Sequence, residues 1–139
     1  MANTKGQIFG INGPVVKVKG SDSFEMQEMV YVGNEELIGE VIGVTSDTTI
    51  VQVYEETTGL KKGEPVVGTG GPLSITLAPG ILSDIFDGIE RPLKEIRNMS
   101  GSFIGRGLKV TNLDERKTWN VEMVAKQGDY VTGGDIIAV

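Results

Sequence analysis

The sequence contains neither cysteine nor histidine. Without cysteine there can be no disulfide framework, and without either residue the chain lacks the usual ligands of zinc, copper and non-haem iron. The same absences remove the Cys–His and Ser–His nucleophile pairs and the commonest general base. Many classes of enzyme are therefore excluded before any motif is considered, and no residue set predicts a metal site.

Long apolar runs are also missing. The longest apolar stretches are only a few residues, so we expect no membrane span and no direct membrane insertion. No charged start leads into an apolar segment with a cleavage site, so we expect no secretory signal and a cytoplasmic location. At 139 residues, of which 39% are hydrophobic, the chain is large enough to bury a core.

Basic residues are scarce in the first 60 positions, which hold three of them against nine acidic residues. Residues 61–139 hold ten of each, so the net charge of −6 belongs to the first part. Nucleic-acid binding depends on Lys and Arg side chains that neutralise phosphates. The acidic first part therefore argues against a nucleic-acid partner.

Glycine, in contrast, is abundant, and its 20 residues recur every few positions. This spacing predicts many short strands joined by tight turns. The Asn12-Gly13 pair predicts a hairpin, because both residues tolerate positive φ. After it, Val16 and Val18 alternate with two lysines, which predicts one buried and one solvated face.

A second alternating segment covers residues 48–56. Its two faces carry Val51, Val53 and Glu55 on one side and Ile50, Gln52 and Tyr54 on the other. We expect a strand that is covered on both sides. Several strands at this spacing predict a closed β-barrel, since closure also removes exposed strand edges.

The residues after the barrel show brief helical signals. Ser83 can cap a short turn that carries Ile85 and Phe86, and Pro92 suits the first position of a helix. In that helix Leu93 and Ile96 would form an apolar pair. The fold class predicted is all-β, with an N-terminal closed β-barrel, a short helical neck and a second β unit. We place these three parts at residues 1–75, 76–100 and 101–139.

The end of the sequence resembles the first half of a biotinyl/lipoyl-type hammerhead. Residues 124–139 contain two Gly-Asp turns, at Gly128-Asp129 and Gly134-Asp135. In carrier domains the modified lysine follows the second Gly-Asp, whereas Lys126 precedes the motif. The resemblance indicates a fold and no attached cofactor. A stand-alone hammerhead-type carrier or small-ligand binding module remains the alternative function.

Other motifs give no catalytic residue. The sequence has no G-x-x-x-x-G-K-[ST] string, and the Gly-rich residues 68–74 lack a following lysine, so they predict a structural turn. Adjacent carboxylates on a strand point to opposite faces and are interpreted as solvated surface. Those pairs are Glu35-Glu36, Glu55-Glu56 and Asp114-Glu115. Arg91 and Arg106 are interpreted as partners of neighbouring acids.

Longer strings carry a family resemblance. They are GQIFGINGPVVKV near the start, QVYEETTGLKKGEPV and LAPGILSDIFDGIERPL within residues 39–93, and FIGRGL at 103–108. Together they resemble the N-terminal region of the catalytic A-type subunit (alpha chain) of the V/A-type rotary ATPases and ATP synthases, over essentially the whole chain. Such complexes couple ATP hydrolysis or synthesis to the transport of H⁺ or Na⁺.

The resemblance implies a role for each part. Residues up to about 75 would be the barrel of the crown, in which A subunits alternate with B subunits in a hexameric ring. The neck would lead towards the nucleotide-binding domain. Residues from about 101 would begin the bulge, or non-homologous insertion, which is of barrel-sandwich type and can contact the peripheral stalk. The head of such an ATPase is cytoplasmic and peripheral to the membrane.

The family's nucleotide-binding and catalytic residues follow the insertion, so the resemblance carries none of them onto this chain. We therefore expect a fragment that is not itself an enzyme and holds no cofactor, while ATP or ADP and Mg²⁺ bind elsewhere in the parent protein. Its role would be hexamer assembly. The candidate subunit-interface residues are in the acidic first part: Glu25, Glu28, Glu35 and Glu36.

Overall fold

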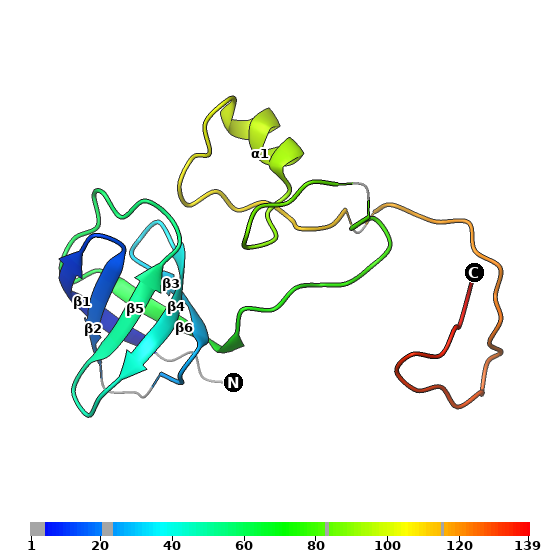
Figure 1. Ribbon diagram of the computed structural model, residues 1–139, viewed down its shortest axis with the longest axis horizontal. Coiled ribbons are helices and arrows are strands. Elements are labelled where there is room, and N and C mark those ends of the chain that lie inside the picture. The colour runs from blue at the N-terminus through cyan, green and yellow to red at the C-terminus, as the bar shows by residue number, and fades with distance from the viewer. Residues whose placement is uncertain (1–4, 21–23, 83, 115) are drawn as a thin grey trace.

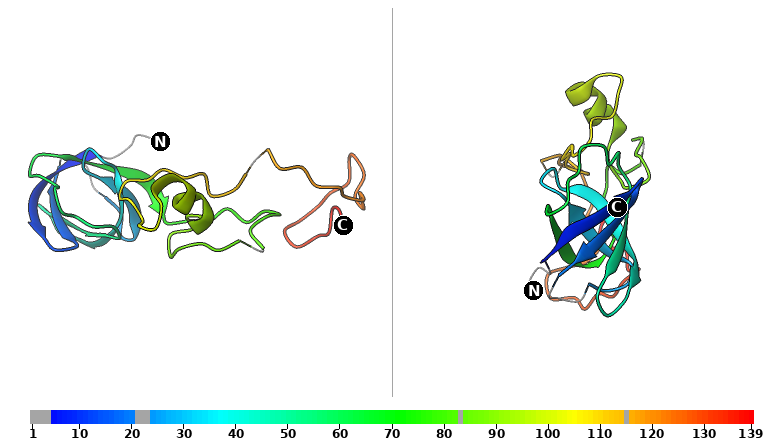
Figure 2. Two further views of the ribbon diagram at one scale, coloured as in Figure 1. Left: turned by 90° about the horizontal axis from the view of Figure 1, so that it is seen from above. Right: turned by 90° about the vertical axis from the view of Figure 1, so that its left-hand side faces the viewer.

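The computed structural model describes residues 5–20, 24–82, 84–114 and 116–139. Strands come first in the chain and a helix follows. The elements are β1 (Lys5–Asn12), β2 (Val15–Lys19), β3 (Glu28–Val32), β4 (Leu37–Val44), β5 (Thr49–Val53), β6 (Pro65–Pro72) and α1 (Leu93–Ser100). The strands gather at one end of an elongated molecule, and the chain beyond α1 extends to the other end (Figures 1 and 2).

The six strands close into an antiparallel barrel in the order β1-β2-β5-β4-β3-β6, with β6 pairing β1. The predicted closed barrel and the all-β class are confirmed. Within the described residues closure gives every strand a pairing partner on both sides, which removes the two free edges of an open sheet. Register shifts with extra residues in β1, β4 and β6 bend these strands around the barrel.

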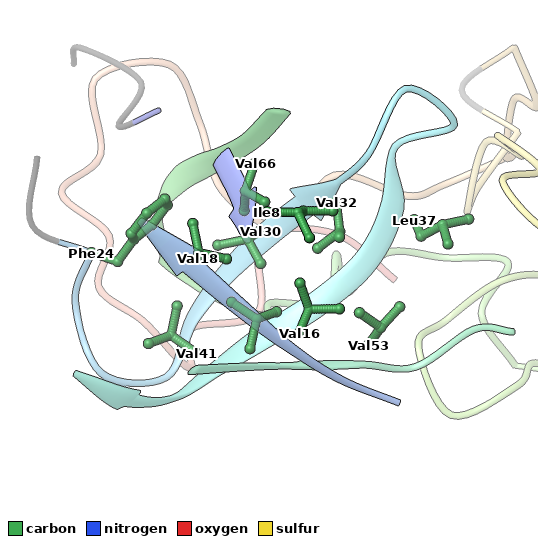
Figure 3. Packing of buried hydrophobic residues seen from close by; sticks show 11 residues of the cluster. Ile8, Val16, Val18, Phe24, Val30, Val32, Leu37, Val41, Val53 and Val66 are labelled. Atoms are coloured by element: carbon green, nitrogen blue, oxygen red, sulfur yellow. The ribbon is translucent and has the colours of Figure 1, made fainter. Parts of the chain in front are cut away.

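The interior of the barrel is filled by branched aliphatic side chains, most of them valine (Figure 3). Val16 and Val18 are buried while Lys17 and Lys19 are exposed, as their alternation predicts. The hairpin at residues 12–15 is also confirmed, because Asn12 pairs with Val15. Its turn residues are Gly13 and Pro14, so of the predicted Asn12-Gly13 pair only the glycine adopts positive φ, at +58°.

The expectation for β5 is wrong on one point. Val51 and Val53 are buried, but Gln52 and Tyr54 on the other face are exposed and Ile50 is half-buried. The reason is that a single-layered barrel fully covers one face, its interior, and among the described residues the outer face of β5 is only partly covered, at Ile50. The alternation of residues in the sequence correctly predicts which side chains face the interior of the barrel, but it does not predict whether another segment covers the outer face.

The neck contains one helix within the described residues. Pro92 stands at the N-cap of α1, and Ile96 is buried whereas Leu93 is half-buried. No helix forms at Ile85 and Phe86, because Phe86 pairs with Pro92 and Ile85 accepts a hydrogen bond from the Leu93 amide. Ser83 lies outside the described residues. None of the helices described is long and apolar enough to cross a membrane.

Residues 101–139 contain little regular structure in the part that is described. Met123 pairs with Ala138, and Glu122 and Val139 exchange backbone hydrogen bonds. Two Asp side chains close the predicted Gly-Asp turns, since Asp129 accepts from the Lys126 amide and Asp135 from the Thr132 amide. The strands predicted from Ser102 onward are not formed as a sheet, because one short pair of strands cannot bury its apolar side chains alone.

Candidate functional site at the junction of barrel and neck

Glu55 connects three separate parts of the chain. It lies two residues after the end of β5, and its side chain is 5% exposed. One carboxylate oxygen, Oε1, accepts from the Ile38 amide of β4 at 3.2 Å. The other, Oε2, accepts from Nη1 of Arg91 at 3.0 Å and from the Gly107 amide at 2.9 Å. The barrel, the neck and the chain after α1 therefore meet at this carboxylate.

Arg91 is the neck residue that contacts this carboxylate. Its Nε donates to Oδ2 of Asp87 at 2.8 Å, while its backbone amide donates to Oδ1 of the same residue at 2.9 Å. Burial alone would lower the pKa of Arg91, but the hydrogen bond and charge of Asp87 and the charge of Glu55 outweigh it and raise that pKa. The guanidinium therefore remains charged, and removal of Arg91 would leave two largely buried carboxylates without their cation.

The pKa of Asp87 is shifted in the opposite direction to that of Arg91. Burial would raise its pKa, but the hydrogen bonds from the Arg91 amide and guanidinium, and from the Ile89 amide, hold the pKa below its ordinary value. The carboxylate therefore orders the turn 87–91 from within and aims Arg91 at the barrel. This local geometry depends on hydrogen bonds between residues four apart or closer.

Glu90 is a second buried carboxylate in the same turn. It adopts φ +62°, which is unusual for a residue other than glycine, and is 7% exposed. Its Oε2 accepts from the Thr76 amide at 3.3 Å and from Nδ2 of Asn112 at 2.9 Å. Its Oε1 is buried and makes no hydrogen bond within the described residues. Glu90 thus fastens residue 112 to the neck.

Residues 105–110, which we call the strap, return from α1 to the barrel (Figure 1). Arg106 pairs with Glu35, and Lys109 pairs with Glu36, both in the turn between β3 and β4. Gly107 adopts φ +65°, and a Cβ at this position would lie 2.8 Å from the backbone oxygen of Glu35. Only glycine fits this close approach without a shift of the backbone.

A cleft of about 680 Å³ lies between the barrel and the strap. The barrel wall includes Tyr31 and Val67, and the opposite wall includes Leu108 and Val110. Glu55 and Arg91 line the same cleft, with their charges already paired. The site consequently offers apolar contact and a fixed ionic anchor, and the hydroxyl groups of Tyr31 and Ser74 also line it. Within the described residues no three Asp or Glu side chains gather as a metal site would require.

The four predicted interface acids occupy different environments. Glu25 is exposed, and its carboxylate makes no hydrogen bond or ion pair in the part of the chain that the structure describes. Glu28 is buried, and its carboxylate accepts from the amides of Gly70 and Glu25 at 2.9 Å each. Glu35 and Glu36 are exposed and pair with the strap. Their role towards another protein of the ring stays a prediction.

Glu55 is the residue that sequence reasoning missed. As interpreted from the sequence, Glu55 and Glu56 are both solvated, but only Glu56 is exposed. The alternation of residues 48–56 did indicate that Glu55 is buried, because Glu55 continues the series of Val51 and Val53 at every second position. The interpretation of Arg91 and Arg106 as partners of acids is confirmed, although Glu55 and Glu35 lie 36 and 71 positions away in the sequence.

Comparison with known proteins agrees with this architecture. The sequence model described as "ATP synthase alpha/beta family, beta-barrel domain" matches residues 8–70, which span β2 to β5 and most of β1 and β6. The barrel is a β-barrel domain of the ATP synthase alpha/beta family. Over 96% of its length the chain is also about 50% identical to the N-terminal region of V/A-type ATP synthase A subunits.

Individual relatives of this ATP synthase family show the same extent of similarity. The V-type ATP synthase alpha chain 2 of Clostridium tetani is 51% identical over 133 residues, which cover 96% of this chain and 22% of the relative. The V-type ATP synthase alpha chain of Halothermothrix orenii is 52% identical over 134 residues, 96% of this chain and 23% of the relative. The chain thus spans less than a quarter of the length of the curated relatives it matches.

Proposed function

We propose that this chain is the N-terminal part of the catalytic A-type subunit of a V/A-type rotary ATPase or ATP synthase, and that it serves assembly of the hexameric head. The observation that carries the proposal is the roughly 50% identity over nearly the whole chain, shared with the alpha chains of such ATP synthases. The barrel would stand beside those of the B subunits in an alternating ring.

The barrel has the properties that this role requires. Its interior is filled by buried aliphatic side chains and its strand ladder is closed, so it resists deformation while other parts of a ring move. Glu55 and Arg91 fix the barrel to the neck, through which movement would reach it. The parent protein would bind ATP or ADP with Mg²⁺ and couple its turnover to H⁺ or Na⁺ transport, in a cytoplasmic head peripheral to the membrane.

The remaining domain assignments belong to the same proposal. Residues 1–75 form the crown domain, residues 76–100 the neck, and residues 101–139 the start of a barrel-sandwich insertion that would reach the peripheral stalk. The paired residues Met123 and Ala138 and the two Asp-closed turns support the last assignment. The nucleotide site lies elsewhere in the parent, which agrees with the missing phosphate-loop string in this sequence.

The test is capture of the matching B subunit by the purified 139-residue chain, measured by pull-down and native mass spectrometry. We expect a complex of the two chains. Calorimetry with Mg²⁺ and ATP should show no heat of binding to the chain alone. Failure to capture the B subunit would count against the assembly role, and micromolar nucleotide binding would show a site in this part of the parent protein.

A charge reversal sharpens the same test. Glu25→Lys changes the predicted interface acid that has no partner within the described residues, and we expect weaker capture of the B subunit. Glu122→Lys is the matched control, because it makes the same charge change in the distant segment that pairs with Val139. Equal capture by both variants and the wild-type chain would remove Glu25 from the interface.

A further inference from the structure

Two kinds of ionic contact hold the chain after β6 against the barrel. The pairs of Arg91 are buried, with side-chain exposures of 9% for Arg91, 5% for Glu55 and 17% for Asp87. The pairs of the strap are open to solvent, with 29% and 49% for Arg106 and Glu35 and 75% and 47% for Lys109 and Glu36. Exposed pairs are weak and are screened by salt, whereas buried pairs are screened much less.

Both ends of the strap are fastened to the neck independently of these exposed pairs. Before the strap, Ile96 of α1 is buried, and Gly101 ends the helix with φ +77°. After the strap, Asn112 donates to the buried carboxylate of Glu90. Between these anchors one backbone group of the strap is hydrogen-bonded to the barrel side within the described residues: the Gly107 amide donates to the Glu55 carboxylate. Few contacts therefore have to break for the strap to leave the barrel.

The strap also covers part of the barrel. Its residues Leu108 and Val110 form one wall of the cleft whose other wall contains Tyr31 and Val67, on the outer faces of β3 and β6. Movement of the strap away from the barrel would open this cleft and expose that outer face. The ion pairs of Arg91 with Glu55 and Asp87 would stay in place, because the strap touches this anchor only through the Gly107 amide, which shares Oε2 of Glu55 with Arg91.

We propose that the strap is a salt-sensitive lid over this cleft, which opens and closes on the barrel while the neck remains docked. The two ion pairs, Arg106 with Glu35 and Lys109 with Glu36, hold it closed, and glycines at 101, 105 and 107 allow the backbone to turn. This device is independent of any other protein in the ring. It gives two of the predicted interface acids a role within the chain itself.

Amide hydrogen exchange measured by NMR on the full 139-residue chain tests the proposal. The salt series runs from about 0.01 M to about 1 M NaCl, over which the screening length falls from about 30 Å to about 3 Å. We expect exchange of the Gly107 amide to accelerate by about 2- to 30-fold, the range given by two exposed ion pairs. The amides of Ile96 in the neck and Val51 in the barrel should change by less than about twofold, because their contacts are not exposed charges.

A variant pair separates the lid from a general effect of charge. Arg106→Gln with Lys109→Gln should accelerate Gly107 exchange at low salt by a similar factor and remove most of its salt dependence. The control is Lys94→Gln with Arg97→Gln, which removes the same charge from two exposed positions of α1 that make no ion pair within the described residues.

The outcomes are distinct. Unchanged Gly107 exchange in both the salt series and the strap variant would overturn the proposal. Parallel acceleration of Ile96 would also overturn it, because strap and neck would then open as one unit. If the strap variant loses protection at Val51 it has unfolded, and the wild-type salt series then decides. None of these results depends on capture of a B subunit, so the lid and the assembly role can fail separately.

Discussion

The barrel and the segment after α1 differ in how far their apolar side chains are buried. Within the barrel, eleven residues form one buried core. In residues 101–139, no described hydrophobic residue is buried, and Phe103 and Tyr130 are 86% and 93% exposed. Both regions contain alternating apolar residues, so composition does not explain the contrast. A closed sheet covers its own apolar face, whereas a single pair of short strands needs other chain segments to do so.

The neck, which lies between these two regions, is held mainly by buried ionic contacts. Among the described residues of the neck, Ile96 and Pro92 are buried apolar residues, and the remaining attachment depends on Arg91 and its two carboxylate partners. Hydrophobic burial is tolerant of small shifts, whereas a buried ion pair holds only in a narrow geometry. The neck is therefore joined to the barrel in one defined orientation with little buried area.

The largest expected effect comes from the barrel core. Leu37→Ala removes a fully buried side chain and should lower the free energy of unfolding by about 2–5 kcal/mol. Urea denaturation followed by far-UV circular dichroism measures it. Ile137→Ala, at a position 52% exposed, is the control and should change stability by less than about 0.5 kcal/mol. Equal effects would mean that the two regions unfold as one unit.

The next effect concerns the ionic anchor. Arg91→Gln leaves Glu55 and Asp87 without their cation and should weaken docking of the neck by about 3 kcal/mol. We expect Ile96 to lose amide protection while the urea midpoint of the barrel hardly changes. Arg97→Gln is the control, because it removes the same charge from an exposed position of α1, the helix that contains Ile96. A matching fall in barrel stability would show that the anchor supports the barrel itself.

Local patterns predicted the barrel but not its anchor. Val16 and Val18 alternate with lysines within four positions, and the Asn12-Gly13 hairpin needs only its own residues, so both could be predicted. Glu55 meets Arg91 and Gly107 only after the chain has turned back, and no periodicity encodes such distant pairs. Its alternation in sequence with Val51 and Val53 of β5 was the single local signal, and the adjacent Glu56 obscured it.

Acid should release the neck before it affects the apolar core. The pKa of Asp87 is lowered in the folded chain, so its contribution to stability is present above the ordinary value of 3.8 and is lost as pH falls through the lowered value. Amide protection of Ile96 should therefore be constant from neutral pH to about pH 4 and decline below it. Asp87→Asn should weaken docking at neutral pH and flatten this decline. A decline that persists unchanged in the variant would assign it to other carboxyl groups.

The smallest effect lies on the outer wall of the barrel. The hydrogen bond from Tyr54 to Glu40, then burial, then the charge of Glu40 raise the pKa of the Tyr54 phenol to about 12. Because the folded value exceeds the unfolded one, this contribution to stability holds below about pH 10 and is lost as pH rises through about 12. Ring NMR signals of Tyr54 should follow that titration, and Glu40→Gln should return the pKa towards 10.0. Glu64→Gln, at a carboxylate that contacts the Asn34 amide, should leave it unchanged. An unaltered pKa in Glu40→Gln would mean that burial, and not the carboxylate, determines the charge of this outer face.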